Sequence, residues 1–345
     1  MKKLVSLVMT GVVAMSALTA CGGSQGTAAT ATTAAGSSAE TAAAAGSGSA
    51  SGEEVVFGTG GTTGTYYAVG GVMATVLNPL MKNSHLTVTS TGASKANIQL
   101  IDDGDADIAI VQNDVMSYAH DGSDLFADEG AYETFAPVAG LYDETVQIIT
   151  CTDDVKTVAD LKGKTVSVGD AGSGVEFNAR QILDAYGLSF DDIKVVNASF
   201  GDSADSLKDQ KIDAAFIVAG APTTAVVDLS TTKDIHLVEL DDEHISTLQS
   251  KYSFYTPTTI PAGTYKGVDA DAKTVSVRAT IIASTKLSED VVYEMLKTMF
   301  DNKDALAAGH AKFELLDLSD ATKGITIPFH PGAKKYYEEQ GVSVN

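Results

Sequence analysis

The chain has 345 residues, and its 45 acidic residues outnumber the 23 lysines and arginines, which gives a formal net charge of −22 at pH 7. This acidity opposes binding to nucleic acid or to an anionic lipid surface, and it favours solubility. With 44% hydrophobic residues in the whole chain, residues 53–345 are long enough for two lobes.

The first twenty residues have the features of a secretory signal peptide. Lys2 and Lys3 precede an apolar run at residues 4–13, which is too short to span a bilayer. The segment ends Leu18-Thr19-Ala20-Cys21, which resembles a bacterial lipobox. That resemblance implies removal of residues 1–20 and lipidation of Cys21. We therefore expect an extracytoplasmic lipoprotein anchored to the cell membrane, in the periplasm or at the cell surface.

Residues 21–52 are expected to form a flexible tether. Residues 22–52 are almost only Ala, Thr, Gly and Ser, so they cannot bury enough surface to offset the entropy of ordering. A coil of about thirty such residues reaches roughly 30 Å. With Cys21 lipidated, Cys151 is the only cysteine left for the body, which excludes an intramolecular disulfide. We expect the Cys151 thiol to be buried and inert.

Strand-like and helix-like segments alternate along the body, which predicts an α/β fold with largely parallel sheets. We place the first lobe at residues 53–140 and 265–345, and the second at residues 141–264. The expected strands are 55–57, 86–90, 108–111, 146–150, 165–168, 195–199, 214–218, 235–239 and 275–283. The expected helices are 66–77, 95–101, 155–164, 175–186, 203–208 and 288–300, with Ser94 and Ser288 as N-caps.

Two glycine-rich turns, at residues 58–64 and 169–174, stand between a strand and a helix. Such a turn leaves backbone N–H groups unpaired at the helix start, where they suit a carboxylate or a phosphate. The first turn lacks the lysine of a P-loop, and Thr63 stands where a dinucleotide fingerprint requires glycine. Because open α/β sheets bind ligands at the carboxyl ends of their strands, we expect both turns to face one cleft. An ordinary tight turn remains the alternative.

No residue pattern predicts catalysis, a cofactor or a metal site. The six histidines show no His-Glu-x-x-His spacing, and Ser173 stands in Gly-Ser-Gly rather than in a Gly-x-Ser-x-Gly nucleophile elbow. Arg180 lies four residues after Glu176, which indicates a surface ion pair rather than a clamp on a ligand. We therefore expect a protein without enzymatic activity, whose ligand carboxylate is held by N–H groups and hydroxyls.

Six motifs follow one another between about residues 55 and 340. They are GTGGTTGTYY at 58–67, STGASKAN at 90–97, GDADIAIVQND at 104–114, VSVGDAGSGVE at 166–176, IDAAF at 212–216 and HPGA at 330–333. Together they resemble the solute-binding proteins of TRAP transporters, in the TAXI subgroup. Val175 departs from the pattern, because relatives often carry threonine there.

The resemblance implies a periplasmic-binding-protein-like fold (type II), in which two α/β lobes joined by hinge strands enclose a ligand cleft. It implies a receptor that binds a small amino acid or carboxylate, with glutamate or glutamine favoured, and delivers it to the TRAP membrane permease. Tyr66 and Tyr67 either wall the pocket or pack in the core. The implied ligand contacts are Gly61, Thr62, Thr63, Gly64, Tyr67, Thr91, Gly92, Ala93, Asn97, Gln112, Asn113, Ser173, Gly174 and Gly220.

Two other functions stay open at this point. The same architecture serves binding proteins of ABC importers and of sensors, and a neighbouring gene for a large permease without an ATPase favours the TRAP reading. The third possibility is an extracellular hydrolase that uses Ser173 with a distant histidine, which loss of turnover in Ser173→Ala would support.

Overall fold

The computed structural model describes residues 52–345. The expected signal peptide, the lipidated Cys21 and the tether as far as residue 51 lie outside the described residues. Among the helices of residues 52–345, none combines the length and the apolar character needed to cross a bilayer.

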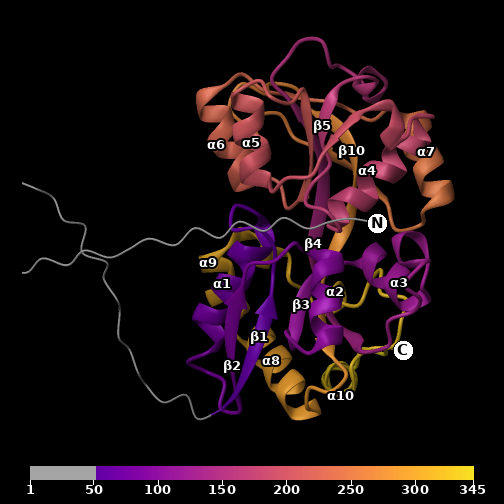
Figure 1. The fold of residues 1–345 in the computed structure, drawn as a ribbon. Coiled ribbons are helices and arrows are strands. Elements are labelled where there is room, and N and C mark those ends of the chain that lie inside the picture. Colours follow the sequence, from indigo (N-terminus) through magenta and orange to yellow (C-terminus); the bar gives the residue numbers. More distant parts are fainter. Residues whose placement is uncertain (1–51) are drawn as a thin grey trace, which may run out of the picture. The chain divides into compact units, whose positions relative to one another are not determined.

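One mixed sheet runs through the described residues (Figure 1). Its strands are β1 (Glu53–Gly58), β2 (Ser84–Thr89), β3 (Ile108–Gln112), β4 (Phe135–Thr150), β5 (Thr165–Ser167), β6 (Lys194–Val196), β7 (Ala214–Ala219), β8 (His236–Leu237), β9 (Thr256–Ile260) and β10 (Ala272–Ser284). They pair in the order β2-β1-β3-β10-β4-β7-β5-β6, while β8 pairs with β4 and β9 with β10. The strands β1, β2 and β3 are parallel, as are β5, β6 and β7.

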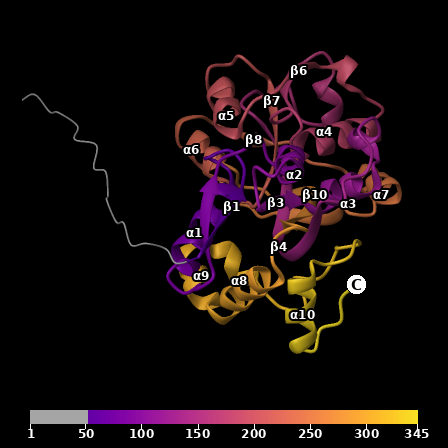
Figure 2. The same cartoon turned by 60° about the horizontal axis from the view of Figure 1, so that its bottom comes forward.

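Helices cover the sheet around both parallel groups (Figures 1 and 2). They are α1 (Thr65–Leu77), α2 (Ser94–Asp103), α3 (Asn113–Asp121), α4 (Gly174–Ala185), α5 (Phe200–Lys208), α6 (Thr224–Thr232), α7 (Asp242–Lys251), α8 (Glu289–Asp301), α9 (Lys303–Gly309) and α10 (Pro331–Glu339). Short 3₁₀ turns occur at η1 (Asp124–Phe126), η2 (Val158–Leu161), η3 (Phe190–Asp192) and η4 (Ala311–Leu315).

The long strands β4 and β10 connect the two parallel groups. They pair with each other in antiparallel fashion from Thr145 and Ser276 to Phe135 and Ser284. At one end β10 also pairs with β3, and at the other end β10 pairs with β9 while β4 pairs with β7. The two strands therefore form a continuous two-stranded link, which Figure 1 shows between the two halves of the molecule.

Buried apolar side chains form a separate core in each lobe. The first cluster lies around β1, β3, α1 and α8, while the second and third lie on the two faces of the sheet around β7. Along β7, Phe216 belongs to the second cluster and Ile217 to the third, because successive side chains of a strand point to opposite faces. Along β10, Val277 belongs to the second cluster and Ala279 to the first. The clusters thus support a crossing between the lobes near Arg278, and the lobe bounds expected from the sequence stay a prediction.

The expected fold class is confirmed, since two α/β lobes are joined by a pair of strands. Ser288 caps α8 as expected, because its Oγ accepts a hydrogen bond from the Val291 N–H at 3.3 Å. Two local predictions were wrong. The N-cap of α2 is Ala93 rather than Ser94, whose Oγ accepts from the Gln112 N–H at 3.1 Å. The helix expected at residues 155–164 is only the turn η2, which a capping box starts.

Candidate functional site

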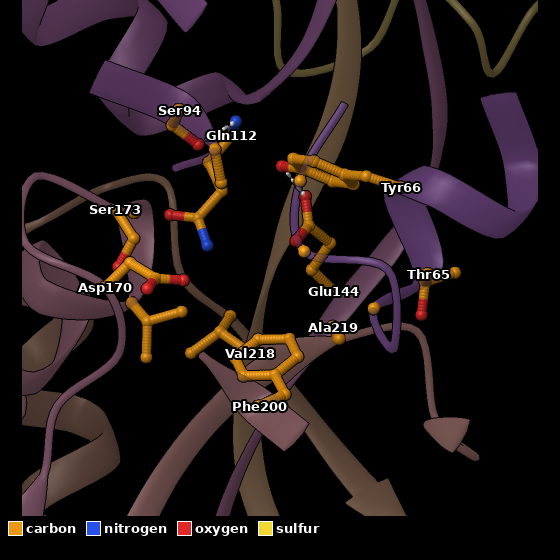
Figure 3. Close-up of a pocket in the computed structure, with 16 residues that line it drawn as sticks. Thr65, Tyr66, Ser94, Gln112, Glu144, Asp170, Ser173, Phe200, Val218 and Ala219 are labelled. Carbon is orange, nitrogen blue, oxygen red and sulfur yellow. Dashed lines mark hydrogen bonds between the residues drawn. The ribbon is translucent and has the colours of Figure 1, made fainter. Parts of the chain in front are cut away.

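A pocket lies where the two lobes meet, at the carboxyl ends of β1, β3, β5 and β7 (Figure 3). It encloses about 490 Å³ of space that no atom fills, part of which is open to solvent. The residues that line it are Gly60, Gly61, Gly64, Thr65, Tyr66, Ala93, Ser94, Gln112, Glu144, Asp170, Ser173, Gly174, Val175, Phe200, Val218 and Ala219.

The N-termini of three long helices border the pocket. The helices α1 and α2 begin after Gly64 and Ala93, and neither of these N-caps accepts a hydrogen bond through a side chain. The third helix, α4, begins after Ser173, whose Oγ accepts from the Glu176 N–H at 3.3 Å. The first turn of a helix presents unpaired N–H groups and a partial positive charge. This part of the pocket therefore suits an anionic group.

Two carboxyl groups also line the pocket. Glu144, on β4, is 2% exposed, and its Oε1 accepts a hydrogen bond from the Tyr66 hydroxyl at 2.6 Å. Burial raises the pKa of Glu144 to about 8. Asp170, in the turn after β5, is partly buried, and burial together with the nearby Asp202 raises its pKa. None of the residues that line the pocket is a lysine, an arginine or a histidine.

Gln112 brings an unpaired acceptor into the pocket. It ends β3 and is 2% exposed, and Figure 3 shows its side chain pointing into the pocket. Its Oε1 is buried and has no hydrogen-bond partner among the described residues. The side chain lies directly over Gly174, where an added Cβ would stand 2.1 Å from that oxygen. Glycine at this position therefore makes room for the glutamine.

An apolar wall completes the pocket. Phe200 at the start of α5 and Val218 and Ala219 at the end of β7 form this wall (Figure 3). Val175 of α4 also lines the pocket. A solute between the lobes would thus place a short apolar part against Phe200 while its polar groups meet the helix starts and the carboxyl groups.

Six of the expected contact residues line this pocket, and whether they contact a ligand stays a prediction. They are Gly61, Gly64, Ala93, Gln112, Ser173 and Gly174. Other expected residues lie in two separate grooves, with Thr63 in one and Thr91 and Gly92 in the other. Thr62 and Tyr67 are not among the residues that line the pocket, and Tyr67 is 36% exposed.

The remaining expected contacts hold the backbone together. Asn97 is fully buried and donates to the carbonyl oxygens of Thr59 at 2.7 Å and Ile110 at 2.8 Å. Asn113 donates to the Gly324 carbonyl at 3.1 Å and accepts from the Arg278 N–H at 2.9 Å. The Gly220 carbonyl accepts from the Thr65 hydroxyl at 3.2 Å. Their polar atoms are thus engaged within the protein.

The pocket wall also contains residues that were not among the expected contacts. Of these, Glu144 had a visible signal, because Asp143 and Glu144 interrupt a long apolar segment that is otherwise typical of a buried strand. Asp170 had a weaker signal in its place within the second glycine turn. Four more lie within three of the quoted motifs, namely Gly60, Thr65, Ser94 and Val175. Nothing in the sequence context marks the remaining Phe200, Val218 and Ala219.

Two smaller expectations can also be compared with the structure. The surface pair of Arg180 and Glu176 is confirmed, with 2.8 Å between Nη2 and Oε1. Cys151 is half-buried rather than buried, and burial raises the pKa of its thiol.

Contacts between the lobes surround the pocket. The Lys95 N–H donates to the Gly172 carbonyl at 3.1 Å, and the Lys312 Nζ donates to the Ala221 carbonyl at 2.7 Å. Behind the pocket, Asp114 of α3 accepts from the Asn178 Nδ2 of α4 at 3.0 Å, and burial raises the pKa of Asp114 to about 7. The structure therefore has its lobes closed around the pocket.

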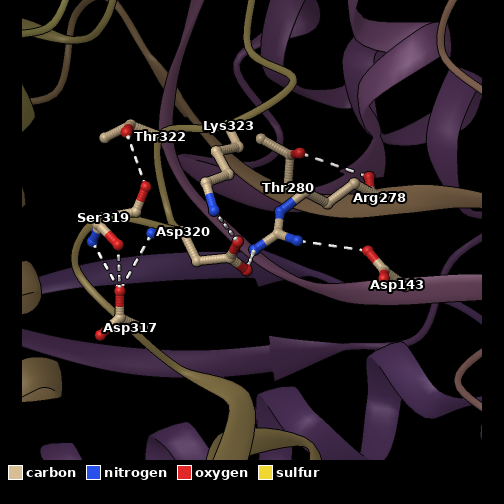
Figure 4. A network of polar contacts seen from close by, with 8 residues as sticks. All are labelled: Asp143, Arg278, Thr280, Asp317, Ser319, Asp320, Thr322 and Lys323. Carbon is tan, nitrogen blue, oxygen red and sulfur yellow. Dashed lines mark hydrogen bonds and ion pairs between the residues drawn. The ribbon is translucent and has the colours of Figure 1, made fainter. Parts of the chain in front are cut away.

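An ion-pair network lies at the link rather than in the pocket (Figure 4). Arg278 of β10 donates to Asp143 of β4 at 3.3 Å and to Asp320 at 2.5 Å. Lys323 also pairs with Asp320, at 3.1 Å. A Cβ at Gly140 would stand 2.5 Å from the Arg278 Nε, so glycine there lets the arginine cross β4. The network ties both strands of the link to the C-terminal part of the first lobe.

Comparisons with known proteins place these features in a family. Residues 57–341 match the NMT1-like family. The periplasmic aliphatic sulphonate binding protein SsuA from Escherichia coli is similar, at 16% identity and a TM-score of 0.44, over 83% of each chain. So is the alkanesulfonate-binding protein SsuA from Xanthomonas axonopodis pv. citri bound to MOPS, at 14% identity, a TM-score of 0.46, and 83% and 90% coverage of this chain and that one. An arginine-bound ArgBP from T. maritima matches at 14% identity and a TM-score of 0.45, covering 72% and 95%. Similarities of this size do not identify a ligand.

Proposed function

The chain belongs to the NMT1-like family, and from this premise and the pocket between its lobes we propose that it is an extracytoplasmic solute-binding receptor without enzymatic activity. More specifically, it serves a TRAP-type secondary transporter as a member of the TAXI subgroup. It binds a small amino acid or carboxylate, with glutamate or glutamine favoured, and delivers it to the membrane permease. Lipidated Cys21 anchors it to the cell membrane.

One observation carries this proposal: both lobes supply the pocket wall, and contacts between the lobes surround it. A pocket built in this way opens and closes when the lobes move on their link, so a solute can enter the open form and be enclosed by the closed form. Capture of a small solute by closure is what a transport receptor requires.

The uncapped helix starts support a carboxylate as one of the recognised groups. Hydrogen bonds from backbone N–H groups to a carboxylate are charge-assisted, and each contributes on the order of 1.5–3 kcal/mol. Thr65 and Tyr66 begin α1, and Gly174 and Val175 begin α4, so both lobes supply such groups. These donors support anion binding without a basic side chain.

The position of Ser173 supports binding rather than hydrolysis. Its hydroxyl caps α4 by accepting the Glu176 N–H, and no histidine is among the residues that line the pocket. A nucleophilic serine needs a general base within hydrogen-bond reach. If a bound solute were recovered chemically changed, and the change were lost in Ser173→Ala, the hydrolase would replace the receptor as the conclusion.

Thermal unfolding of the full chain with individual amino acids and organic acids tests the proposal. A ligand at about 100 times its Kd stabilises the folded state by about 2.7 kcal/mol, so the melting temperature rises measurably. We expect at least one such solute, and we expect Gln112→Ala to reduce the rise without unfolding the unliganded protein. Gln340→Ala, at the exposed end of α10, is the matched control. If no solute raises the melting temperature, the receptor function is wrong.

The proposed TRAP-type transporter also predicts which energy source drives uptake. Uptake by vesicles that contain the cognate permease should require this protein and an ion gradient. A requirement for ATP instead would assign the receptor to an ABC importer.

A further inference from the structure

We propose that the solute is a zwitterion, whose ammonium group lies among the acceptor atoms of Gln112, Glu144 and Asp170 and whose carboxylate meets the first turns of α1 and α4. This inference rests on the proposed function and narrows it. The pocket should therefore bind carboxylates without an amine only weakly, and it should prefer a solute that carries no net negative charge.

The unpaired oxygen of Gln112 is the first argument. A buried amide oxygen without a hydrogen-bond partner is rare, because it has lost its water without replacement. Oε1 of Gln112 is such an atom, since it is buried and has no partner among residues 52–345. The pocket therefore lacks a donor at this point, and a solute that brings N–H groups supplies it.

The two acidic side chains of the pocket wall are the second argument. Glu144 and Asp170 both face the pocket, and no basic side chain lines it. The Tyr66 hydroxyl binds only Oε1 of Glu144, so Oε2 is left for a donor from the solute. Burial keeps the Glu144 carboxyl largely protonated near pH 7, but an ammonium group beside it favours the ionised form. A carboxylate without an amine supplies neither a positive charge nor N–H donors to these oxygens. An ammonium group turns the same neighbourhood into an attractive one.

The start of α1 lies in a different part of the pocket from the acceptor groups, whereas the start of α4 lies next to Gln112 (Figure 3). Figure 3 shows Gln112, Glu144 and Asp170 pointing into one space, while Thr65 at the start of α1 lies on the other side of Tyr66 and Glu144. The helices α1 and α4 have 13 and 12 residues, so each provides a developed helix dipole. Acceptors and donors thus surround one small volume, an arrangement that matches a solute with both charges.

Pairs of solutes that differ only in the amino group test this inference. L-glutamine is compared with 4-carbamoylbutanoate, its analogue without the amine, and L-glutamate is compared with glutarate. Isothermal titration calorimetry on the full chain should give at least tenfold tighter binding for the amino member of a pair. L-glutamine should bind more tightly than L-glutamate, because its net charge is zero. Equal or tighter binding of the amine-free member overturns the inference.

Two variants locate the amine. Glu144→Gln keeps an acceptor for the Tyr66 hydroxyl but removes the carboxyl group that an ammonium group would ionise. Asp170→Asn replaces the second carboxyl group by an amide. At least one of them should reduce the affinity for the amino member tenfold or more and leave that for the amine-free member unchanged. Glu243→Gln, on the exposed start of α7, removes a carboxyl group that does not line the pocket and should change neither of the two affinities. If both pocket variants retain full discrimination, the ammonium does not lie among these groups.

A wider panel separates this inference from the receptor function. The remaining amino acids and their amine-free analogues are titrated in the same way. If only amine-free acids bind, the protein is a receptor and the zwitterion inference is wrong. If no member of the panel binds, both conclusions fail.

Discussion

Glu144 links the chemistry of the pocket to the stability of the protein. Its carboxyl group is buried, and its pKa in the folded protein is about 8, whereas the ordinary value is 4.5. The folded state therefore keeps a proton that the unfolded chain loses above about pH 4.5. This contribution to the free energy of unfolding is fully present below that pH, and it is lost as the pH rises to about 8.

We therefore expect the free energy of unfolding of the ligand-free protein to fall between pH 5 and pH 8. The slope is roughly 1.4 kcal/mol per pH unit for one such group, and Asp114, with a pKa of about 7, adds to it over the lower part of the range. Urea unfolding at several pH values measures the slope, and Glu144→Gln should flatten it. Glu243→Gln should leave it as in the unaltered protein, and a slope that Glu144→Gln does not change would contradict the assignment.

At this scale some of the expected contact residues line the pocket and others do not, and contact with a ligand stays a prediction for all of them. Gln112, Ser173 and Gly174 line the pocket, while Asn97 and Asn113 bind backbone carbonyls instead. All of these polar residues stand beside glycine turns or at strand ends, so sequence alone does not tell whether a side-chain amide faces a ligand or a neighbouring backbone group. That choice depends on segments distant in the chain, such as Ile110 and Gly324.

At the scale of elements, Gly174 at the start of α4 packs directly against the side chain of Gln112 at the end of β3. We expect Gly174→Ala to displace the Gln112 side chain from the pocket, since the added Cβ would stand 2.1 Å from Oε1 and 2.3 Å from Cδ. Ligand affinity should therefore fall about as much as in Gln112→Ala. The double variant should be no weaker than either single one, because both changes remove the same contact.

Gly71→Ala is the matched glycine control. Gly71 lies inside α1, and an added Cβ there meets nothing within 4 Å. This change should stabilise the protein by about 0.5–1 kcal/mol through helix propensity and leave the affinity measured by calorimetry unaltered. Additive losses in the double variant of Gly174 and Gln112 would show that the two residues act separately.

Helices with a clear apolar periodicity could be predicted from the sequence. Strands whose bounds depend on pairing with distant strands could not. The helices α1, α4 and α8 follow the apolar periodicity and the turns at their starts. The length of β4 was hidden because its polar residues Asp143 and Glu144 stand at the crossing between the lobes, where the strand borders the pocket. The helix α3 was not predicted, since its exposed and buried polar residues mask its apolar face.

At the scale of the whole molecule, a few hydrogen bonds between the lobes hold the closed form. Lys312 extends from the first lobe to the Ala221 carbonyl of the second, so Lys312→Met should favour the open form without ligand. Small-angle X-ray scattering should show a larger radius of gyration for this variant, and saturating ligand should restore the value of the unaltered protein. The apparent affinity should fall in proportion to the closed fraction.

Lys82→Met provides the comparison, because Lys82 is exposed and lies away from the second lobe. It should change neither the radius of gyration nor the affinity. If Lys312→Met behaves like Lys82→Met in both measurements, this hydrogen bond does not contribute to closure.

The connection between the lobes is a pair of hydrogen-bonded strands, and Arg278 braces it against Asp143 and Asp320. We expect the lobes to open by twisting of this ribbon, because its backbone groups are already paired and a hinge of two strands has no loose segment. Substitutions at Arg278 or Asp320 should then change the rate at which a bound solute leaves, although neither residue lines the pocket.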